Sequence, residues 1–238
     1  MINLFTYWEG IKPAYISLCE EILVSTINTN ICYHKITSEN VNDYISVDKL
    51  PSKFSNITCL AHRADYIRCS LLYLYGGMWL DLDQVIISDL SNINDMTVNY
   101  DYITYEWEPF RPSIGFLFSK KQNILLKLWK QQMDQKIESG ITLTWESLGY
   151  EILWPIIKDL IANSQLKYYA FPAKTSFAPL EWNEQDKFFS DSYTLDYKNL
   201  YSVMLYNSQI PQWFKNMTKE EILNSNYFIS RLLKANYG

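Results

Sequence analysis

The sequence predicts an α/β fold in which a mostly parallel central sheet is flanked by helices. Near the N-terminus, a strand pattern at 2–8, a helical stripe at 15–23 and a second strand pattern at 31–37 follow one another. This order builds a parallel strand pair with a right-handed crossover. Later, a helical pattern leads through a double glycine into an apolar stretch at 78–87. We expect a single domain over residues 1–238, because a chain of this length can bury one large core.

The helix before the double glycine is predicted by its apolar spacing. Its apolar positions recur every three or four residues, and Gly76-Gly77 ends the pattern where a helix needs a left-handed terminator. The stretch 78–87 that follows reads as one buried strand whose only charges are Asp81 and Asp83. Residues two apart in a strand point to the same side, so the two carboxylates should lie together. Such a pair must share a proton or a cation, and a divalent cation keeps both ionised.

The remaining elements complete an alternating pattern. We expect strands at 100–107, 114–119, 166–171 and 200–206, a helix from residue 124, and a helix at 145–161 that is interrupted around Pro155. A last helix should start at Thr218, whose hydroxyl can cap it together with Glu221.

Composition excludes some classes of protein. The net charge is −5 without a basic cluster, which argues against a nucleic-acid surface. The most apolar stretch, 152–162, is broken by Lys158 and Asp159 and is too short for a membrane span. Four scattered cysteines and the lack of a secretory leader favour reduced thiols, so we expect a cytoplasmic protein, in the host cytoplasm if the source is a virus. Aromatic residues reach 16 %, which suits either a carbohydrate site or a tyrosine-rich core.

One motif in the sequence resembles that of a known group of enzymes. The residues Ala64-Asp65, Arg68, Gly76-Gly77, Trp79, Asp81 and Asp83 are similar to the motif of the DxD glycosyltransferases of the sugar-binding-region type. That group includes the capsular polysaccharide synthesis proteins, the yeast initiating mannosyltransferase family and the clostridial glucosylating toxins. The one departure within the motif is Trp79, where tyrosine is usual.

The resemblance implies a fold, an activity and partners. The fold would be of the GT-A type, a Rossmann-like nucleotide-sugar-binding domain, with residues 1–90 forming the nucleotide-sugar half that ends in the DxD motif and 91–238 forming the acceptor side and the C-terminal helices. The activity would be a metal-dependent transfer of a hexose from a UDP- or GDP-sugar to a glycan hydroxyl, with retention of configuration. Polysaccharide biosynthesis, such as that of a capsule, would be the setting.

The resemblance also assigns roles to single residues. The first strand segment ends in Trp-x-Gly, as the family segment does, and its Trp8 would stack on the base. Asp65 would contact the ribose. Arg68 would reach the diphosphate, which suits a planar guanidinium. Asp83 would be the direct ligand of Mn²⁺ or Mg²⁺, and Asp81 would hold ribose and sugar hydroxyls beside it. The candidate catalytic residues are therefore Asp81, Asp83 and Arg68, and the candidate nucleotide-sugar contacts are Trp8, Asp65, Arg68, Trp79 and Asp81.

A C-terminal segment supplies a further candidate. Many relatives read His-Leu-Tyr-Asn where this chain reads Met204-Leu205-Tyr206-Asn207. A residue here completes the metal or diphosphate shell, so Asn207 joins Asp81 and Asp83 as a candidate metal ligand, with Ser208 as its substitute. Ile114-Gly115-Phe116 stands where relatives carry Asn-Gly-Phe, so one sugar contact is missing. Three acids lie where they could touch an acceptor: Glu106, Glu108 and Glu146.

Other interpretations of these residues remain open. The fold could bind a sugar nucleotide without transferring it, although loss of an Asp from the DxD would then be expected. Asp81-Leu82-Asp83 is also similar to the nucleophile motif of haloacid-dehalogenase-type phosphohydrolases, but Gln84 replaces their usual glycine and the chain lacks an Asp-Asp pair. Trp8 could be an ordinary core ring, and Asp65 with Arg68 could form a surface ion pair.

Overall fold

The computed structural model describes residues 1–107 and 110–237. The chain divides into two compact units, each assembled from three segments. Unit 1 comprises Met1–Glu9, Cys32–Leu80 and Ile93–Phe171, and unit 2 comprises Gly10–Ile31, Asp81–Asn92 and Pro172–Gly238. Both units therefore take segments from either side of residue 90.

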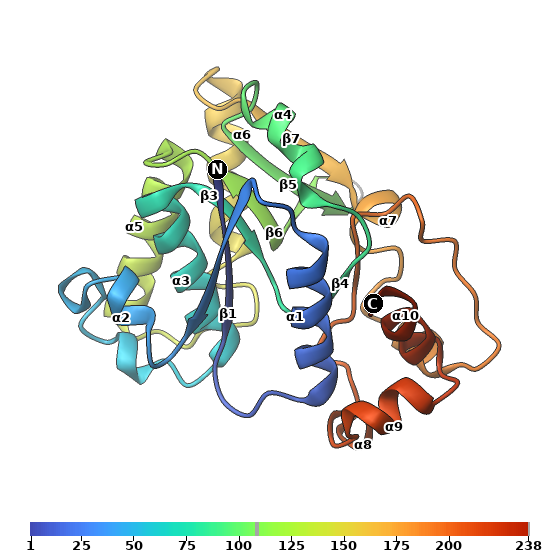
Figure 1. Cartoon of the computed structure of the whole chain (residues 1–238). Coiled ribbons are helices and arrows are strands. Elements are labelled where there is room, and N and C mark those ends of the chain that lie inside the picture. Colours follow the sequence, from blue (N-terminus) through green and yellow to red (C-terminus); the bar gives the residue numbers. More distant parts are fainter. Residues whose placement is uncertain (108–109, 238) are drawn as a thin grey trace. The chain divides into compact units, whose positions relative to one another are not determined.

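Unit 1 is built on a six-stranded sheet with the order β2-β1-β3-β6-β5-β7 (Figure 1). Strand β1 runs parallel to β3, whereas β6 runs antiparallel to both β3 and β5. The antiparallel part follows from connectivity, because β5 and β6 are joined by a short loop that allows only a hairpin. These features confirm the predicted α/β class. The strand bounds are β1 Ile2–Trp8, β2 Ile31–Thr37, β3 Gly77–Leu80, β5 Tyr102–Trp107, β6 Arg111–Ser119 and β7 Tyr168–Pro172.

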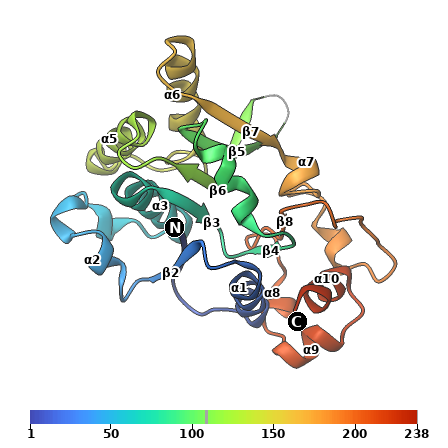
Figure 2. The ribbon, with the colours of Figure 1, turned by 45° about the horizontal axis from the view of Figure 1, so that its top comes forward.

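Three long helices cover this sheet. Helix α3 packs against β1, β3, β6 and α5, and α6 packs against α5 and β6 (Figure 2). The bounds are α2 Val41–Tyr44, α3 Leu60–Tyr75, α4 Asn94–Thr97, α5 Ile124–Ser139 and α6 Tyr150–Ala162. Short 3-10 turns occupy Val47–Lys49, Phe54–Asn56, Leu90–Ile93 and, in unit 2, Gln185–Phe189. Within the described part of the chain, we find no helix with the length and apolar character needed to span a membrane.

The junction between α3 and β3 confirms the role predicted for the double glycine. Gly76 follows the last residue of α3 with φ of 69°, and its N–H donates to the Leu72 carbonyl at 2.9 Å. Gly77 has φ of 113°, and a Cβ there would collide with the backbone oxygen of Asn3 in β1. A Cβ at Gly76 would likewise collide with the backbone nitrogen of Lys121, at 2.7 Å. Both positions therefore require glycine for the dihedral angle and for close packing.

Unit 2 is organised around a helix and a two-stranded sheet. Strand β4 pairs antiparallel with β8, and α1 packs against β4, α9 and α10. The predicted capping box of Thr218 and Glu221 is present at the start of α9. The bounds are α1 Ala14–Thr26, β4 Gln84–Ile86, α7 Ala173–Ser176, β8 Ser202–Met204, α8 Gln212–Lys215, α9 Lys219–Asn224 and α10 Phe228–Asn236.

Two predicted elements are wrong in detail. The stretch 78–87 is two strands, because β3 ends at Leu80, residues 82–83 form a turn, and β4 starts at Gln84 and pairs in the other sheet. The prediction gave one strand because both strands are buried and so form one continuous apolar stretch. Only Asp81 and Asp83 indicated the junction between the two strands. Helix α6 starts at Tyr150 and runs through Pro155 without the predicted interruption. The helix continues although a proline at this position cannot donate to the carbonyl of Glu151.

Candidate functional site

The motif residues on α3 form a buried ion pair in unit 1. A guanidinium nitrogen of Arg68 lies 3.2 Å from a carboxylate oxygen of Asp65, and the two side chains are only 5 % and 8 % exposed. Their spacing of three places them on one face of the helix. The surface ion pair considered from the sequence is therefore wrong. Burial removes both charges from water, so each needs the other.

Arg68 is also fixed by neighbours outside its helix. Its Nη1 donates to the carbonyl of Ile114 in β6, and its guanidinium carbon lies 4.9 Å from the centre of the Trp79 ring. Trp79 is 1 % exposed and belongs to the hydrophobic core of unit 1. Trp79, the aromatic residue of the motif, thus holds the Arg68 guanidinium over its ring through a cation–π contact.

A second aromatic ring among the candidate residues, that of Trp8, lies at the carboxyl end of β1. Trp8 is the last residue of β1 and is half-buried rather than part of the core. The next residue, Glu9, accepts hydrogen bonds from the Tyr7 hydroxyl at 2.5 Å and from Arg63 at 2.6 Å. Burial, and then the hydrogen bond to Glu9, raise the pKa of Tyr7 well above its usual value. Because β1 and β3 run parallel, Trp8 lies at the edge where α/β sheets bind ligands.

In unit 2, the DxD acids lie at the turn that leads into β4. Both side chains are partly exposed, whereas Leu82 between them is buried. The strand geometry from which the sequence analysis placed both carboxylates on one side is absent, because residues 82–83 form a turn. The turn is instead fixed by long-range hydrogen bonds to Asp83.

Asp83 is bound by the segment that follows β8. The backbone N–H of Leu205 donates to the Asp83 carbonyl at 2.8 Å, and the backbone N–H of Asn207 donates to the Asp83 carboxylate at 2.6 Å. Between these donors Tyr206 has φ of 56°, a left-handed conformation that is rare for a residue other than glycine. This conformation turns the chain so that both N–H groups reach the same aspartate.

A third side chain joins Asp83 and Asn207. The hydroxyl of Tyr15 on α1 donates a hydrogen bond to Oδ1 of Asn207. Tyr15 is fully buried, and burial, followed by the negative charge of Asp83, raises the pKa of its hydroxyl well above the usual value. The same two causes raise the pKa of the Cys19 thiol one turn later in α1. The structure therefore brings together the predicted Asp83 and Asn207 and adds Tyr15, which the sequence analysis did not select.

The donor set of this segment fits a hard divalent cation. Asp81 and Asp83 offer carboxylate oxygens, both side chains are reached by solvent, and manganese or magnesium prefers oxygen ligands. Among the described residues, no group of three or more His, Cys, Asp or Glu side chains is placed to hold a metal. Magnesium-type sites commonly use one or two carboxylates together with substrate phosphates, so two aspartates suit a cation that arrives with a diphosphate.

The three glutamates considered as acceptor contacts have different surroundings. Glu106 accepts a hydrogen bond from the Tyr168 hydroxyl at 3.3 Å, and Glu146 is paired with Arg111 at the start of β6. Glu108 lies outside the described residues. The ion pair with Arg111 gives Glu146 a structural partner.

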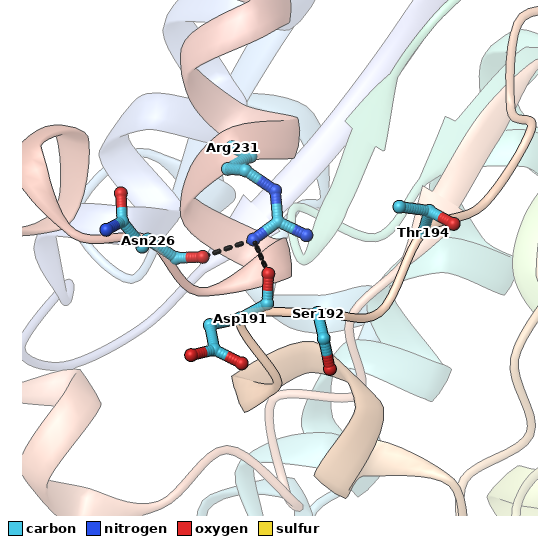
Figure 3. Close-up of a pocket in the computed structure, with 5 residues that line it drawn as sticks. All are labelled: Asp191, Ser192, Thr194, Asn226 and Arg231. Atoms are coloured by element: carbon cyan, nitrogen blue, oxygen red, sulfur yellow. Dashed lines mark hydrogen bonds between the residues drawn. The ribbon is translucent and has the colours of Figure 1, made fainter.

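A separate hollow of about 530 Å³ in unit 2 contains none of the motif residues. It is lined by Asp191, Ser192, Thr194, Asn226 and Arg231. Figure 3 shows the Arg231 guanidinium donating to the carbonyls of Asp191 and Asn226, and a third bond reaches the carbonyl of Tyr193. Arg231 thereby ties α10 to the loop at 191–193 and to Asn226 just before the helix, which is a structural role.

Comparisons with known proteins identify one matching family, several similar sequences and a similar fold. Residues 4–137 match the profile of a family described as capsular polysaccharide synthesis protein. The match spans more than half of the chain and contains Trp8 together with the entire motif from Ala64 to Asp83.

Relatives and one solved structure are similar to parts of the chain. O-glycosyltransferase braB of Annulohypoxylon truncatum is 28 % identical over 120 residues, which cover 44 % of this chain and 28 % of that protein. O-glycosyltransferase PaGT of Phomopsis amygdali is 32 % identical over 76 residues, covering 29 % of this chain and 19 % of that protein. The chain thus covers less than a third of either relative. The structure of the PaToxG glycosyltransferase superposes with a TM-score of 0.51 at 13 % identity, over 68 % of this chain and 70 % of that one, which confirms the fold class.

Proposed function

The chain belongs to the capsular polysaccharide synthesis protein family, and we propose from this that it is a glycosyltransferase. It moves a hexose from a UDP- or GDP-sugar to a hydroxyl of a glycan, in polysaccharide or glycan synthesis. The observation that carries the proposal is the family match over residues 4–137, which includes every position of the DxD motif. The relatives braB and PaGT are both named O-glycosyltransferases.

Residues of unit 1 are proposed to bind the nucleotide part of the donor. Trp8 stacks on the base, which its half-exposed position at the end of β1 supports. Asp65 accepts hydrogen bonds from the ribose, and Arg68 donates to the diphosphate. Trp79 acts through Arg68, because its ring is buried beneath the guanidinium. Because Trp79 already holds the Arg68 side chain in place, less side-chain conformational entropy is lost when the donor binds.

Residues of unit 2 are proposed to bind the diphosphate and the sugar. Asp83 is the direct protein ligand of Mn²⁺ or Mg²⁺, and Asp81 holds ribose and sugar hydroxyls beside it. Asn207 completes the metal or diphosphate shell next to Asp83. The bound ion would neutralise negative charge on the departing nucleoside diphosphate. The hydrogen bond from the Asn207 backbone supports this role, because it orients the Asp83 carboxylate before a ligand arrives.

The transfer is proposed to retain the configuration of the sugar. The bond from the anomeric carbon to the diphosphate breaks, a bond to the acceptor oxygen forms on the same face, and the proton of the acceptor passes to the departing diphosphate oxygen. Retention requires no protein base, and Glu146 is already paired with Arg111. Proton NMR of the first product tests this point, because an anomeric coupling opposite to that of the donor means inversion.

A thermal-shift panel of sugar nucleotides tests the function itself. A ligand that binds only the folded state raises the melting temperature, so one UDP- or GDP-hexose should raise it with manganese present and raise it less with chelator. Release of the matching nucleoside diphosphate should then require an acceptor glycan. Stabilisation without turnover would identify an inactive binder, and the absence of any shift would contradict the proposal.

A further inference from the structure

The side-chain amide of Asn207 is polarised by its surroundings in unit 2. Its oxygen, Oδ1, accepts the hydrogen bond from the buried Tyr15 hydroxyl. Its nitrogen, Nδ2, makes no hydrogen bond to any residue that the structure describes, and the side chain is half-exposed. The oxygen end therefore faces the protein interior, and the nitrogen end is the one that remains for a ligand.

This polarity is set by Tyr15. A buried phenol needs a partner for its O–H, and among the described residues Asn207 Oδ1 is the acceptor that this hydroxyl has. If the amide turned over, the nitrogen would face the phenol oxygen and the phenol proton would lose its acceptor. A buried hydroxyl proton without an acceptor is unfavourable, so the amide keeps its oxygen toward Tyr15.

The backbone on either side of Asn207 prevents the side chain from moving away. Its own N–H is held by the Asp83 carboxylate at 2.6 Å, and the N–H of Gln209 donates to the Tyr206 carbonyl at 2.7 Å. The left-handed Tyr206 fixes the turn that precedes it. The backbone of Asn207 is therefore held at the Asp83 carboxylate, and its amide is oriented by the Tyr15 hydroxyl.

We propose that Asn207 serves the donor substrate as a hydrogen-bond donor to a diphosphate oxygen, with Tyr15 as the residue that orients it. An amide nitrogen carries two N–H donors and no acceptor, which suits a phosphate oxygen and does not suit a metal ion that requires oxygen ligands. This inference rests on the proposed function and specifies it: Asp83 holds the cation, and Asn207 contacts the diphosphate anion.

The substitution Asn207→Asp separates this role from metal ligation. Aspartate has nearly the same shape and keeps an oxygen for the Tyr15 hydroxyl, but it replaces the N–H donors with a negatively charged oxygen. We expect UDP or GDP, whichever the wild-type protein binds, to bind at least about tenfold more weakly, because one hydrogen bond to a charged group is lost and repulsion is added. If Asn207 ligates the metal instead, the added carboxylate should tighten binding of Mn²⁺.

Calorimetry with UDP and GDP and electron paramagnetic resonance with Mn²⁺ alone measure both quantities without a turnover assay. The proposal expects weaker nucleotide binding with unchanged Mn²⁺ affinity in Asn207→Asp. Tighter Mn²⁺ binding, or unchanged nucleotide binding in a folded variant, would overturn it while leaving the proposed function in place. If the wild-type protein binds neither UDP nor GDP, the proposed function fails and the inference fails with it.

Double substitution tests the role of Tyr15. Tyr15→Phe removes only the hydroxyl and should weaken nucleotide binding severalfold, but it should have no further effect once Asn207→Ala is present, because Tyr15 acts through Asn207. Tyr66→Phe is the matched control, since its buried hydroxyl donates to Asp134 at 2.7 Å in unit 1. Equal losses from Tyr15→Phe and Tyr66→Phe, or additive losses in the double variant, would show a general packing effect and contradict the orienting role.

Discussion

The backbone N–H of Asn207 donates to the Asp83 carboxylate at 2.6 Å, although 124 residues separate the two in the sequence. The orientation of the proposed metal ligand therefore depends on the segment after β8 as well as on its own turn. Substitutions in residues 204–207 should therefore change the orientation of the Asp83 carboxylate even when the DxD motif itself is unchanged.

Replacing Asp83 with asparagine should abolish hexose transfer and leave the fold intact. The amide oxygen can still accept the Asn207 N–H, but the variant lacks the negative charge that a divalent cation requires. Release of nucleoside diphosphate in manganese, together with the melting temperature, measures both effects. Asp89→Asn is the control, because the Asp89 carboxylate is also in unit 2 and accepts hydrogen bonds from Asn28 and Ser91. Full activity of the wild-type enzyme in excess chelator would contradict the metal role.

Replacing Trp8 with alanine should weaken nucleotide binding by roughly 1–3 kcal/mol, the range for stacking of a base on an aromatic ring. Calorimetric titration with the nucleoside diphosphate measures the change. Trp145→Ala is a suitable control, because that ring is also in unit 1 and is 65 % exposed. Equal affinity in wild-type and Trp8→Ala proteins would show that the ring does not contact the base.

Breaking the Asp65–Arg68 pair should cost about 3–5 kcal/mol of unfolding free energy, because either single substitution leaves a buried charge without its partner. Urea unfolding of Asp65→Asn and Arg68→Gln measures this cost. Lys120→Met breaks the more exposed pair with Asp101 and should cost at most about 1 kcal/mol. Similar losses at the two sites would mean that burial of the Asp65–Arg68 pair has little energetic weight.

Replacing Gly77 with alanine should destabilise unit 1 by at least about 1–3 kcal/mol from backbone strain alone, with the clash against Asn3 added. Gly140→Ala provides the comparison, because Gly140 also has positive φ but an added Cβ would meet only the flexible end of Lys53, at 3.4 Å. Thermal unfolding of both variants should show the larger loss for Gly77. The reverse order would mean that the β1–β3 contact adjusts easily.

Local patterns predicted most elements of this fold. Apolar spacing and the double glycine placed α3 and its end, and the Thr218–Glu221 pair placed the start of α9, because these signals act within a few residues. The break between β3 and β4 was missed because burial of both strands gave one continuous apolar run, and a change of pairing partner leaves no local mark.

The candidate site was predictable only where a motif carried it. The motif selected Asp65, Arg68, Asp81 and Asp83, but not the burial of the α3 ion pair, which depends on β6 packing over it. Tyr15 was missed because it sits in the apolar stripe of α1 and reads as a core ring. Its hydroxyl contacts Asn207 across 192 residues of sequence, and no local pattern signals such a contact.

The buried Asp65–Arg68 pair also bears on how this protein can evolve. A mutation at either position removes the ion-pair partner of the other buried charge, so the two sites are epistatic. A lineage can replace the pair only through an unstable single mutant or by changing both residues at once. Homologues should therefore keep both residues or neither. A homologue that retains only one would be a candidate for relaxed selection on donor binding, recognisable from its gene sequence before any assay.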